Sequence, residues 1–369
     1  MIDAVADKTL LPDTLSNAPH KSDADRMGGV MRIFLTTLVF AVAALTSGQA
    51  ARAQSVEEFY KGRQVQVIIS STSGSTYDRY ARFLVQHMGK HIPGNPSFVP
   101  RNMPGAGGIV ATQYLHRIAP KDGSAFGTVS RNLPFEPILG KLEANFDPLS
   151  FVWLGSMNHE RSIAISWHTS KVKMLADLQH MELLVPGNGA GSDSEVIPLA
   201  FNALFGTKFK IVRGYTGNTE STLAVERGEL EGIAYWSWSA IQSGHKHWLD
   251  GNKVNVLFHT GPEPDPEIKA PSIRTLVRDE NQRAALEFIL AREILGRPFL
   301  APPGVPLDRA KALQAAFNAT MKDPAFIAEA QKRNIEVQLV TGEQVTDVLR
   351  KAVAAPAPVI ESVKQALER

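Results

Sequence analysis

The sequence predicts an α/β protein with more than one domain. Strand-like and helix-like segments alternate along the chain, which is typical of parallel sheets with helices on both faces. The 369-residue chain is too long for one ordinary core and fits two domains, even without its first 53 residues. Apolar residues make up 44% of the chain, which is enough for a globular interior.

The alternation begins with a buried strand over Val65–Ser70, a polar turn and an amphipathic helix. Apolar residues from Tyr77 to Met88 recur at helical spacing, and Ser75 is expected to cap this helix with Asp78 three residues on. Further strands are expected at Ser97–Arg101, Ala125–Ser130, Ile163–Trp167, Leu183–Val185, Phe209–Val212, Ile233–Trp236 and Val254–His259. Further helices are expected at Ile109–Ile118, Met174–His180, Glu195–Phe205, from Asn218 to Arg227, at Leu307–Met321, and from Gly342, where Thr341 and Gln344 form a capping box.

Glycine- and hydroxyl-rich loops stand between a strand and a helix at four places: Ser71–Thr76, Asn102–Gly108, Gly187–Ser194 and Tyr215–Thr219. Each delivers a helix N-terminus, where backbone N–H groups lack partners and the dipole is positive. Ligands of parallel sheets collect at this strand-to-helix position, so the loops favour an anion such as a carboxylate. Helix capping alone is the alternative interpretation of each loop.

The candidate ligand-binding residues come from these loops and from two later segments. Arg131 and Arg213 lie near strand ends, where a guanidinium group is able to assist carboxylate binding. Tyr235-Trp236-Ser237-Trp238 fits either core packing or a stacking surface for a planar acid. The full set is Thr72, Ser73, Gly74, Ser75, Thr76, Asp78, Gly105, Ala106, Gly107, Arg131, Gly189, Gly191, Ser192, Asp193, Tyr215, Thr216, Gly217, Tyr235 and Trp236.

The sequence lacks the motifs of several other classes of protein. Neither glycine-rich loop continues as G-x-G-x-x-G, and no G-x-x-x-x-G-K or G-x-S-x-G occurs. The chain has no cysteine, which excludes thiol catalysis and Cys-based metal sites. His87 and His91 stand four apart on a helix without a third ligand, so we expect a solvated helix face. We expect no catalytic residue, metal or cofactor, and a net charge of +2 without basic runs argues against nucleic acid.

The N-terminal segment predicts export from the cytoplasm. Arg32 precedes a mostly apolar run from Ile33 to Leu45, and Ala51-Arg52-Ala53 follows as a small-residue cleavage site. The run is shorter than the roughly 20 residues of a membrane-spanning helix, which disfavours a retained anchor. Cleavage is expected after Ala53. Translation is expected to start at Met27 or Met31, in which case the polar residues before them are not part of the protein. The alternative is that these residues form a disordered extension of the signal peptide.

Several motifs of the sequence resemble those of a known family, the Bug-type extracytoplasmic solute receptors of the tripartite tricarboxylate transporters. Asn102-Met103-Pro104-Gly105-Ala106-Gly107-Gly108 is similar to the family's N-x-P-G-A-G-G. Three weaker motifs follow in order, at Ala119–Gly123 (A-P-D-G-Y in the family), Phe146–Pro148 (Y-D-P) and Ala301–Pro306 (A-P-A-G-T-P). The resemblance covers nearly the whole chain after the signal segment.

This resemblance implies a two-lobed periplasmic binding protein fold of type II, each lobe a mainly parallel sheet flanked by helices. We expect residues 54–155 and 259–369 to form the first lobe and residues 156–258 the second. A small carboxylate is expected in the cleft between the lobes of a monomer, for delivery to membrane permease subunits. Presentation of the ligand to a sensor kinase ectodomain is the alternative, and a periplasmic enzyme is a further one.

The resemblance also implies where the family's contacts lie. The family's F-P-P-G-G-G-T-D loop is matched in part by Ser70–Asp78, its second-lobe loop by Gly187–Ser194, and its Y-K-G-S-A segment by Tyr215–Thr219. Where the family often has D-N-x-P-S-A, this chain has Tyr235-Trp236-Ser237-Trp238-Ser239-Ala240. The change loses an acidic group and adds aromatic rings, which favours planar or aromatic acids as ligands.

Overall fold

The computed structural model describes residues 54–140, 144–189, 192–261 and 265–368. The expected signal segment and its cleavage site lie outside these ranges. Residues from Ser55 onward form one compact unit, to which the following description applies. In the part of the chain that the structure describes, none of the helices is long and apolar enough to cross a membrane.

The first sheet has six strands in the order β11-β4-β10-β3-β1-β2. They are β1 (Gln64–Ile69), β2 (Ser97–Asn102), β3 (Ala125–Thr128), β4 (Val152–Ser156), β10 (Pro298–Ala301) and β11 (Val340–Thr341). β1 pairs in parallel with both β2 and β3, whereas β10 runs antiparallel to β3 and β4. The loops that follow β1, β2 and β3 therefore emerge at one edge of the sheet.

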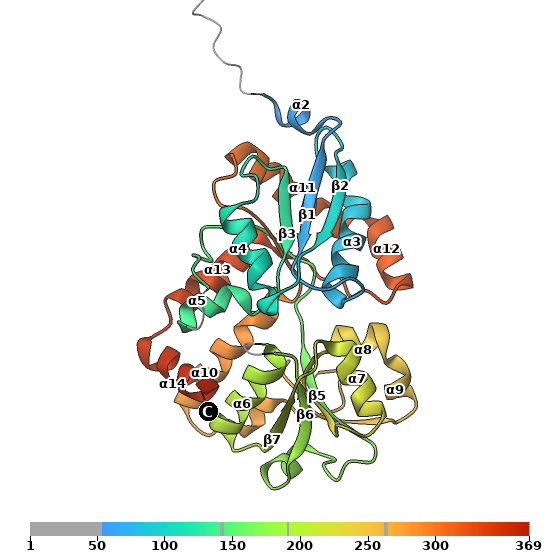
Figure 1. Cartoon of the computed structure of the whole chain (residues 1–369), viewed down its shortest axis with the longest axis vertical. Helices are drawn as coiled ribbons and strands as arrows, with labels where there is room; N and C mark the ends of the chain where they lie inside the picture. Colours follow the sequence, from blue (N-terminus) through green and yellow to red (C-terminus); the bar gives the residue numbers. More distant parts are fainter. Residues whose placement is uncertain (1–53, 141–143, 190–191, 262–264, 369) are drawn as a thin grey trace, which may run out of the picture. The chain divides into compact units, whose positions relative to one another are not determined.

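Helices cover this sheet on both sides. Figure 1 shows α3 and α12 beside one another at one side and α4 at the other; the rings of Phe83 and Phe326 stack between α3 and α12. The helices of this part are α2 (Val56–Tyr60), α3 (Thr76–Met88), η1 (Gly89–His91), η2 (Ala106–Gly108), α4 (Ile109–Arg117), η3 (Leu133–Phe135), α5 (Glu136–Leu139), α11 (Leu307–Lys322), α12 (Pro324–Lys332) and α13 (Gly342–Val353).

The remaining strands form a second group. They are β5 (Ser162–Trp167), β6 (Leu183–Gly187), β7 (Phe209–Arg213), β8 (Gly232–Ser237) and β9 (Val254–His259). β6 and β7 are parallel, while β5 runs antiparallel to β8 and β9. The N–H of Glu231 donates to the carbonyl oxygen of Leu184, which joins β6 to the start of β8. The loops after β6 and β7 thus share one edge as well.

Helices also flank the second group, with α6 on one side and α7, α8 and α9 on the other (Figure 1). They are η4 (Leu175–Gln179), α6 (Asp193–Phe205), α7 (Asn218–Glu226), α8 (Trp238–Gly244) and α9 (Lys246–Asp250). The chain then passes through η5 (Ile273–Leu276), α10 (Glu280–Leu290) and η6 (Ala291–Leu295) on its way to β10. The last helix, α14 (Ala357–Glu368), packs against α6 and α10.

The structure confirms the predicted α/β class, with small shifts at element ends. The segment expected as a helix at Met174–His180 is the short 3-10 helix η4. The sequence pattern does not predict β4 and β10. Both are short, and β10 is buried at every position, so neither offers the alternation that marks a half-exposed strand. The predicted capping box of Thr341 and Gln344 is present at the start of α13.

Candidate functional site

The loops after β1, β2 and β3 lie together because their strands end in register. Ile69 is aligned with Asn102 of β2 on one side and with Thr128 of β3 on the other. This places the Ser71–Thr76 loop, the glycine run after Asn102 and the segment carrying Arg131 at the same edge. The sequence predicted this juxtaposition from strand–helix alternation alone.

The loop after β1 is stabilised from within by Asp78. Ser75 caps α3 by accepting from the N–H of Asp78, as predicted. The buried Asp78 carboxylate accepts from the N–H of Gly74 at 2.8 Å, from Nδ2 of Asn102 at 2.9 Å and from Nε of Arg82 at 2.8 Å. Burial opposes its charge, but these hydrogen bonds prevail and lower the pKa of Asp78. Asp78 therefore shapes the loop, and its carboxylate has little capacity left for a ligand.

The exposed part of this loop is composed of small side chains. Thr72, Ser73 and Gly74 are exposed, and Thr76 is half-buried at the first position of α3. Gly74 has a φ of +79°, in the left-handed region that favours glycine. Small exposed hydroxyls at a helix N-terminus leave room for an anion to approach the backbone.

The glycine run after β2 has an unusual backbone. Gly105, Ala106, Gly107 and Gly108 all have positive φ, and a Cβ at Gly108 would lie 2.8 Å from Cδ1 of Leu133 and 3.2 Å from Cβ of Ser70. Only glycine fits that last position without a shift of its neighbours. The first three residues of the run are exposed, which leaves their backbone accessible at the start of α4.

The loop after β6 ends at α6. Asp193 is the first residue of that helix, and Ser192 stands at its N-cap without a side-chain capping bond. The N–H of Gly189 donates to the buried carboxylate of Glu195 at 3.0 Å, which ties Gly189 to the first turn of the helix. Gly191 lies outside the described residues.

A carboxylate–arginine contact joins the two loop edges. Nε of Arg131, after β3, donates to Oδ2 of Asp193 at 3.0 Å, and Nη1 of Arg292 donates to Oδ1 at 2.9 Å. Both arginines are almost fully buried, and the Asp193 side chain is 19% exposed. Burial opposes the charge of Asp193, but Arg292 and Arg131 outweigh it and lower its pKa. Asp193 is therefore ionised and held between two guanidinium groups.

Buried donors without partners among the described residues lie at the same edge of the first sheet. Arg131 lies 4% exposed, and its Nη1 has no hydrogen-bond partner among the described residues; its Nη2 donates to Ser162 at 3.0 Å. The hydroxyls of Ser70 and Thr128, at the ends of adjacent strands, are likewise buried without a partner there. Buried polar groups are normally satisfied, so these three point to a ligand or water.

A second buried network lies beside the first. Glu160 is fully buried and pairs with Arg297 at 3.1 Å, and both contact the Ser239 hydroxyl. The Arg297 guanidinium stacks on the rings of Tyr77 and Tyr80. Each charge has its counter-charge at hydrogen-bond distance, so this pair leaves no net charge for a ligand, and removing one partner would leave the other buried and unpaired.

Sequence pattern and spacing alone do not identify Arg292 or Glu160 as part of this site. The available signal was the Arg292-Glu293 pair inside a largely apolar run, because buried charges are rare unless they are paired.

The segment after β7 is more exposed than the others. Tyr215 and Gly217 are half-buried and Thr216 is exposed. The N–H of Thr216 donates to Glu220 at 2.8 Å, so part of this helix start is already satisfied by the chain's own carboxylate.

The aromatic segment is part of the core. Trp236 is 4% exposed and packs against Trp248 and His245, and Trp238 is also buried. The core-packing interpretation therefore describes both tryptophans. Tyr235 is different, because its ring lies 4.9 Å from the Arg131 guanidinium and its hydroxyl donates to Glu293 at 2.8 Å.

The expectation of a solvated face at His87 and His91 is wrong for His87. Its Nε2 lies 3.0 Å from Glu329, and its ring packs against Phe83 and Phe326, which joins α3 to α12. His91 contacts Asp323 at 3.2 Å. Within the described ranges, no group of three acidic, histidine or cysteine side chains is arranged to hold a metal.

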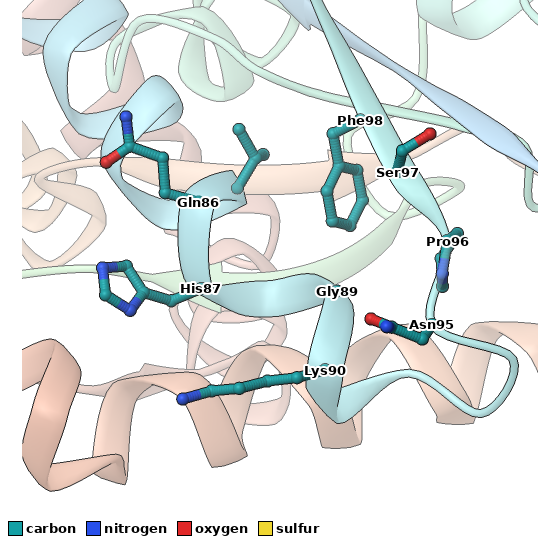
Figure 2. Close-up of a pocket in the computed structure, with 9 residues that line it drawn as sticks. Gln86, His87, Gly89, Lys90, Asn95, Pro96, Ser97 and Phe98 are labelled. Carbon is teal, nitrogen blue, oxygen red and sulfur yellow. The ribbon is translucent and has the colours of Figure 1, made fainter.

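A cavity of about 360 Å³ lies near these histidines and not at the predicted site. Figure 2 shows lining residues from the end of α3, from η1 and from the start of β2, among them His87, Lys90 and Phe98. Because it adjoins the first residues of β2, this cavity lies at the opposite end of the strand from the glycine run.

Comparison with known proteins identifies the fold. No family model matches the chain. A UPF0065 protein encoded in the gbd 5' region of Cupriavidus necator is 23% identical over 348 residues, which cover 90% of this chain and 97% of that protein. The periplasmic binding protein BugD superposes with a TM-score of 0.65 at 17% identity, over 83% of this chain and 98% of BugD. The chain has the fold of a Bug-type periplasmic binding protein.

A second solved structure has the same fold. It is an R. palustris protein determined with adipate, with a TM-score of 0.63, 19% identity, and coverage of 82% of this chain and 97% of that one. The resemblance to the Bug-type receptors and the type II periplasmic binding protein fold are thereby confirmed.

Proposed function

We propose that this chain is an extracytoplasmic solute-binding protein that captures a small carboxylate and delivers it to a tripartite tricarboxylate-type permease. One observation carries the proposal: Arg131 and Arg292 already hold a carboxylate, that of Asp193, at the N-terminus of α6. Charge-assisted hydrogen bonds from guanidinium groups are among the strongest that a carboxylate accepts. The site thus has the chemistry of a carboxylate receptor.

The unpartnered donors supply the contacts for a second, incoming carboxylate. Nη1 of Arg131 and the hydroxyls of Ser70 and Thr128 are buried at the carboxyl ends of β1 and β3. Charge-assisted bonds contribute roughly 1.5–3 kcal/mol each, so three to four such contacts support micromolar binding, about −8 kcal/mol. Exposed backbone at the starts of α3 and α4 adds further donors.

The comparisons agree with this class of ligand. A protein of the same fold was determined with adipate, a dicarboxylate. Proteins of this fold are described as periplasmic binding proteins, which supports a periplasmic location and binding without turnover. We propose the same for this chain, acting as a monomer without a cofactor and without nucleic acid. We also propose that residues 54–155 with 259–369, and residues 156–258, form the two lobes that enclose the ligand.

A thermal-shift screen tests the proposal. Purified protein is incubated with mono-, di-, tri- and aromatic carboxylates, and each acid is paired with its uncharged amide as a matched control. A ligand that binds the native state raises the melting temperature by mass action. The proposal predicts stabilisation by at least one acid and none by its amide. Stabilisation by sugars or cations with no response to any acid contradicts it.

Turnover is tested on the same samples. Each stabilising acid is incubated with the protein and recovered for mass spectrometry. The binding function predicts quantitative recovery of the unchanged acid, whereas a chemically altered product contradicts it and favours an enzyme.

A further inference from the structure

Three charged pairs near the loop edges are balanced one to one. Asp78 pairs with Arg82, Glu195 with Arg213, and Glu160 with Arg297. In each pair the opposite charges lie within 3.1 Å. These six side chains therefore leave no net charge for a ligand to neutralise.

The contact at Asp193 is unbalanced. Arg131 and Arg292 each donate to the same carboxylate, one to each oxygen. Within the described part of the chain, neither arginine forms an ion pair with any other acidic group. Two guanidinium groups sharing one carboxylate leave one positive charge in excess.

Glu293 is the nearby acid that would remove this excess if it were ionised. It lies 3% exposed, its Oε1 accepts from Tyr235 at 2.8 Å, and the Thr260 hydroxyl lies within 2.7 Å of both its oxygens. Burial raises the pKa of Glu293, and although Arg131 and these hydrogen bonds oppose the rise, the net direction is upward. The Glu293 carboxylate accepts from hydroxyl groups and forms no ion pair with an arginine among the described residues, so the pairing of two arginines with one carboxylate at Asp193 stays unbalanced.

Free donors accompany the excess charge. Nη1 of Arg131 and Nη2 of Arg292 are buried and lack hydrogen-bond partners among the described residues. Because both guanidinium groups bind the same Asp193 carboxylate, these two nitrogens lie in one neighbourhood. A buried guanidinium nitrogen without a partner is costly, so an anion that accepts from it is favoured.

We propose that this site selects ligands with a single negative charge, and that Asp193 sets this selectivity by neutralising one of the two positive charges of Arg131 and Arg292. The inference rests on the proposed function and specifies its substrate class as monocarboxylates. A second ligand carboxylate would find the charge of the two buried arginines already matched, by Asp193 and by the first ligand carboxylate, and would face the Asp193 carboxylate in a poorly solvated site. Like charges brought together in this way discriminate against the wrong ligand.

Calorimetric titration of the full-length purified protein with chain-matched pairs tests the inference. The pairs are butyrate and succinate, hexanoate and adipate, and benzoate and terephthalate. The inference predicts that in the best-bound pair the monocarboxylate binds at least tenfold more tightly than the dicarboxylate. Equal or tighter binding of the dicarboxylate overturns the inference and leaves the proposed function standing. Binding of neither member of any pair overturns both.

A charge variant tests the role of Asp193 itself. Asp193→Asn removes one negative charge, so the dicarboxylate is expected to gain about tenfold in affinity relative to its monocarboxylate partner. The matched control is Glu182→Gln, which makes the same change in net charge on an exposed side chain before β6. The control is expected to keep the wild-type ratio, and an equal change in both variants overturns the assignment to Asp193. If Asp193→Asn does not fold, the wild-type pairs decide the inference alone.

Discussion

Arg131 and Asp193 connect two parts of the chain that are 62 residues apart, through a hydrogen bond of 3.0 Å from Nε to Oδ2. Arg131 follows β3 of the first sheet, and Asp193 opens α6 of the second group. The contact places a guanidinium group and a helix N-terminus at the same carboxylate. Both are positive, which is why a carboxylate is stable there despite being largely removed from water.

The first prediction concerns the planar guanidinium group of Arg131. Arg131→Lys keeps the positive charge but loses the geometry that reaches Asp193 and Ser162 together. Loss of one charge-assisted bond costs about 1.5–3 kcal/mol, so carboxylate affinity should fall roughly 10- to 100-fold in calorimetric titration. The control is Arg213→Lys, whose side chain is 69% exposed. Similar losses in both variants would argue against a direct role for Arg131.

The second prediction concerns the buried pair of Glu160 and Arg297. Glu160→Gln leaves Arg297, which is 2% exposed, without its counter-charge. Breaking a buried ion pair typically costs about 3–5 kcal/mol of unfolding free energy. Asp250→Asn, which breaks an exposed pair with Lys246, should cost less than about 1 kcal/mol. Urea unfolding monitored by circular dichroism compares the two, and equal costs would refute the structural role given to Glu160.

The third prediction concerns pH. Burial, reinforced by the neighbouring charge of Glu160, raises the pKa of Glu336 from 4.5 to about 7. A raised folded-state pKa means that the stabilisation is complete below about pH 4.5 and is lost as the pH rises to about 7. The side chain is 30% exposed, so we expect a loss of roughly 1–2 kcal/mol, less than the full shift implies.

Glu336→Gln provides the comparison for this pH effect. The difference in unfolding free energy between wild type and variant should shift against the wild type between pH 4.5 and 7, measured by urea unfolding at each pH. A difference that stays constant over this range would show that Glu336 titrates normally.

The fourth prediction concerns the glycine run. Gly108→Ala places a Cβ 2.8 Å from Leu133 and requires a φ of +102°, so we expect a loss of about 1–3 kcal/mol and weaker carboxylate binding. Gly244→Ala is the control, because a Cβ there meets nothing within 4 Å and the residue lies in α8. That control should be neutral or slightly stabilising in thermal unfolding. A neutral result for Gly108→Ala would show that the run tolerates side chains.

Much of the candidate site was predictable because parallel strands impose a common edge on their loops. The alternation of strands and helices predicts that the Ser71–Thr76 loop, the glycine run and Arg131 lie at one edge of the sheet, and the register of β1 with β2 and β3 places them there. The capping role of Ser75 was predictable from local sequence, because a serine hydroxyl just before a helix accepts a hydrogen bond from a backbone N–H of the first turn. Strand–helix alternation and helix capping both depend on residues that are close in sequence, so the sequence alone predicts them.

The rest depends on contacts between distant segments. Arg292 reaches Asp193 across 99 residues, and its role is set by tertiary packing around η6. The sequence predicts that Trp236 and Trp238 alternate along one strand, but Trp236 lies in β8 and Trp238 begins α8. The core position of Trp236 is set by its contact with Trp248 of α9, which is distant in sequence from the strand.

A crystal structure of the protein with its best-bound carboxylate tests the central claim most directly. The account predicts that the ligand carboxylate accepts from Arg131 and lies within hydrogen-bond distance of the Ser70 or Thr128 hydroxyl, between the starts of α4 and α6. A ligand bound elsewhere, for instance in the cavity beside His87 and Lys90, with Arg131 and Asp193 unchanged, would contradict it.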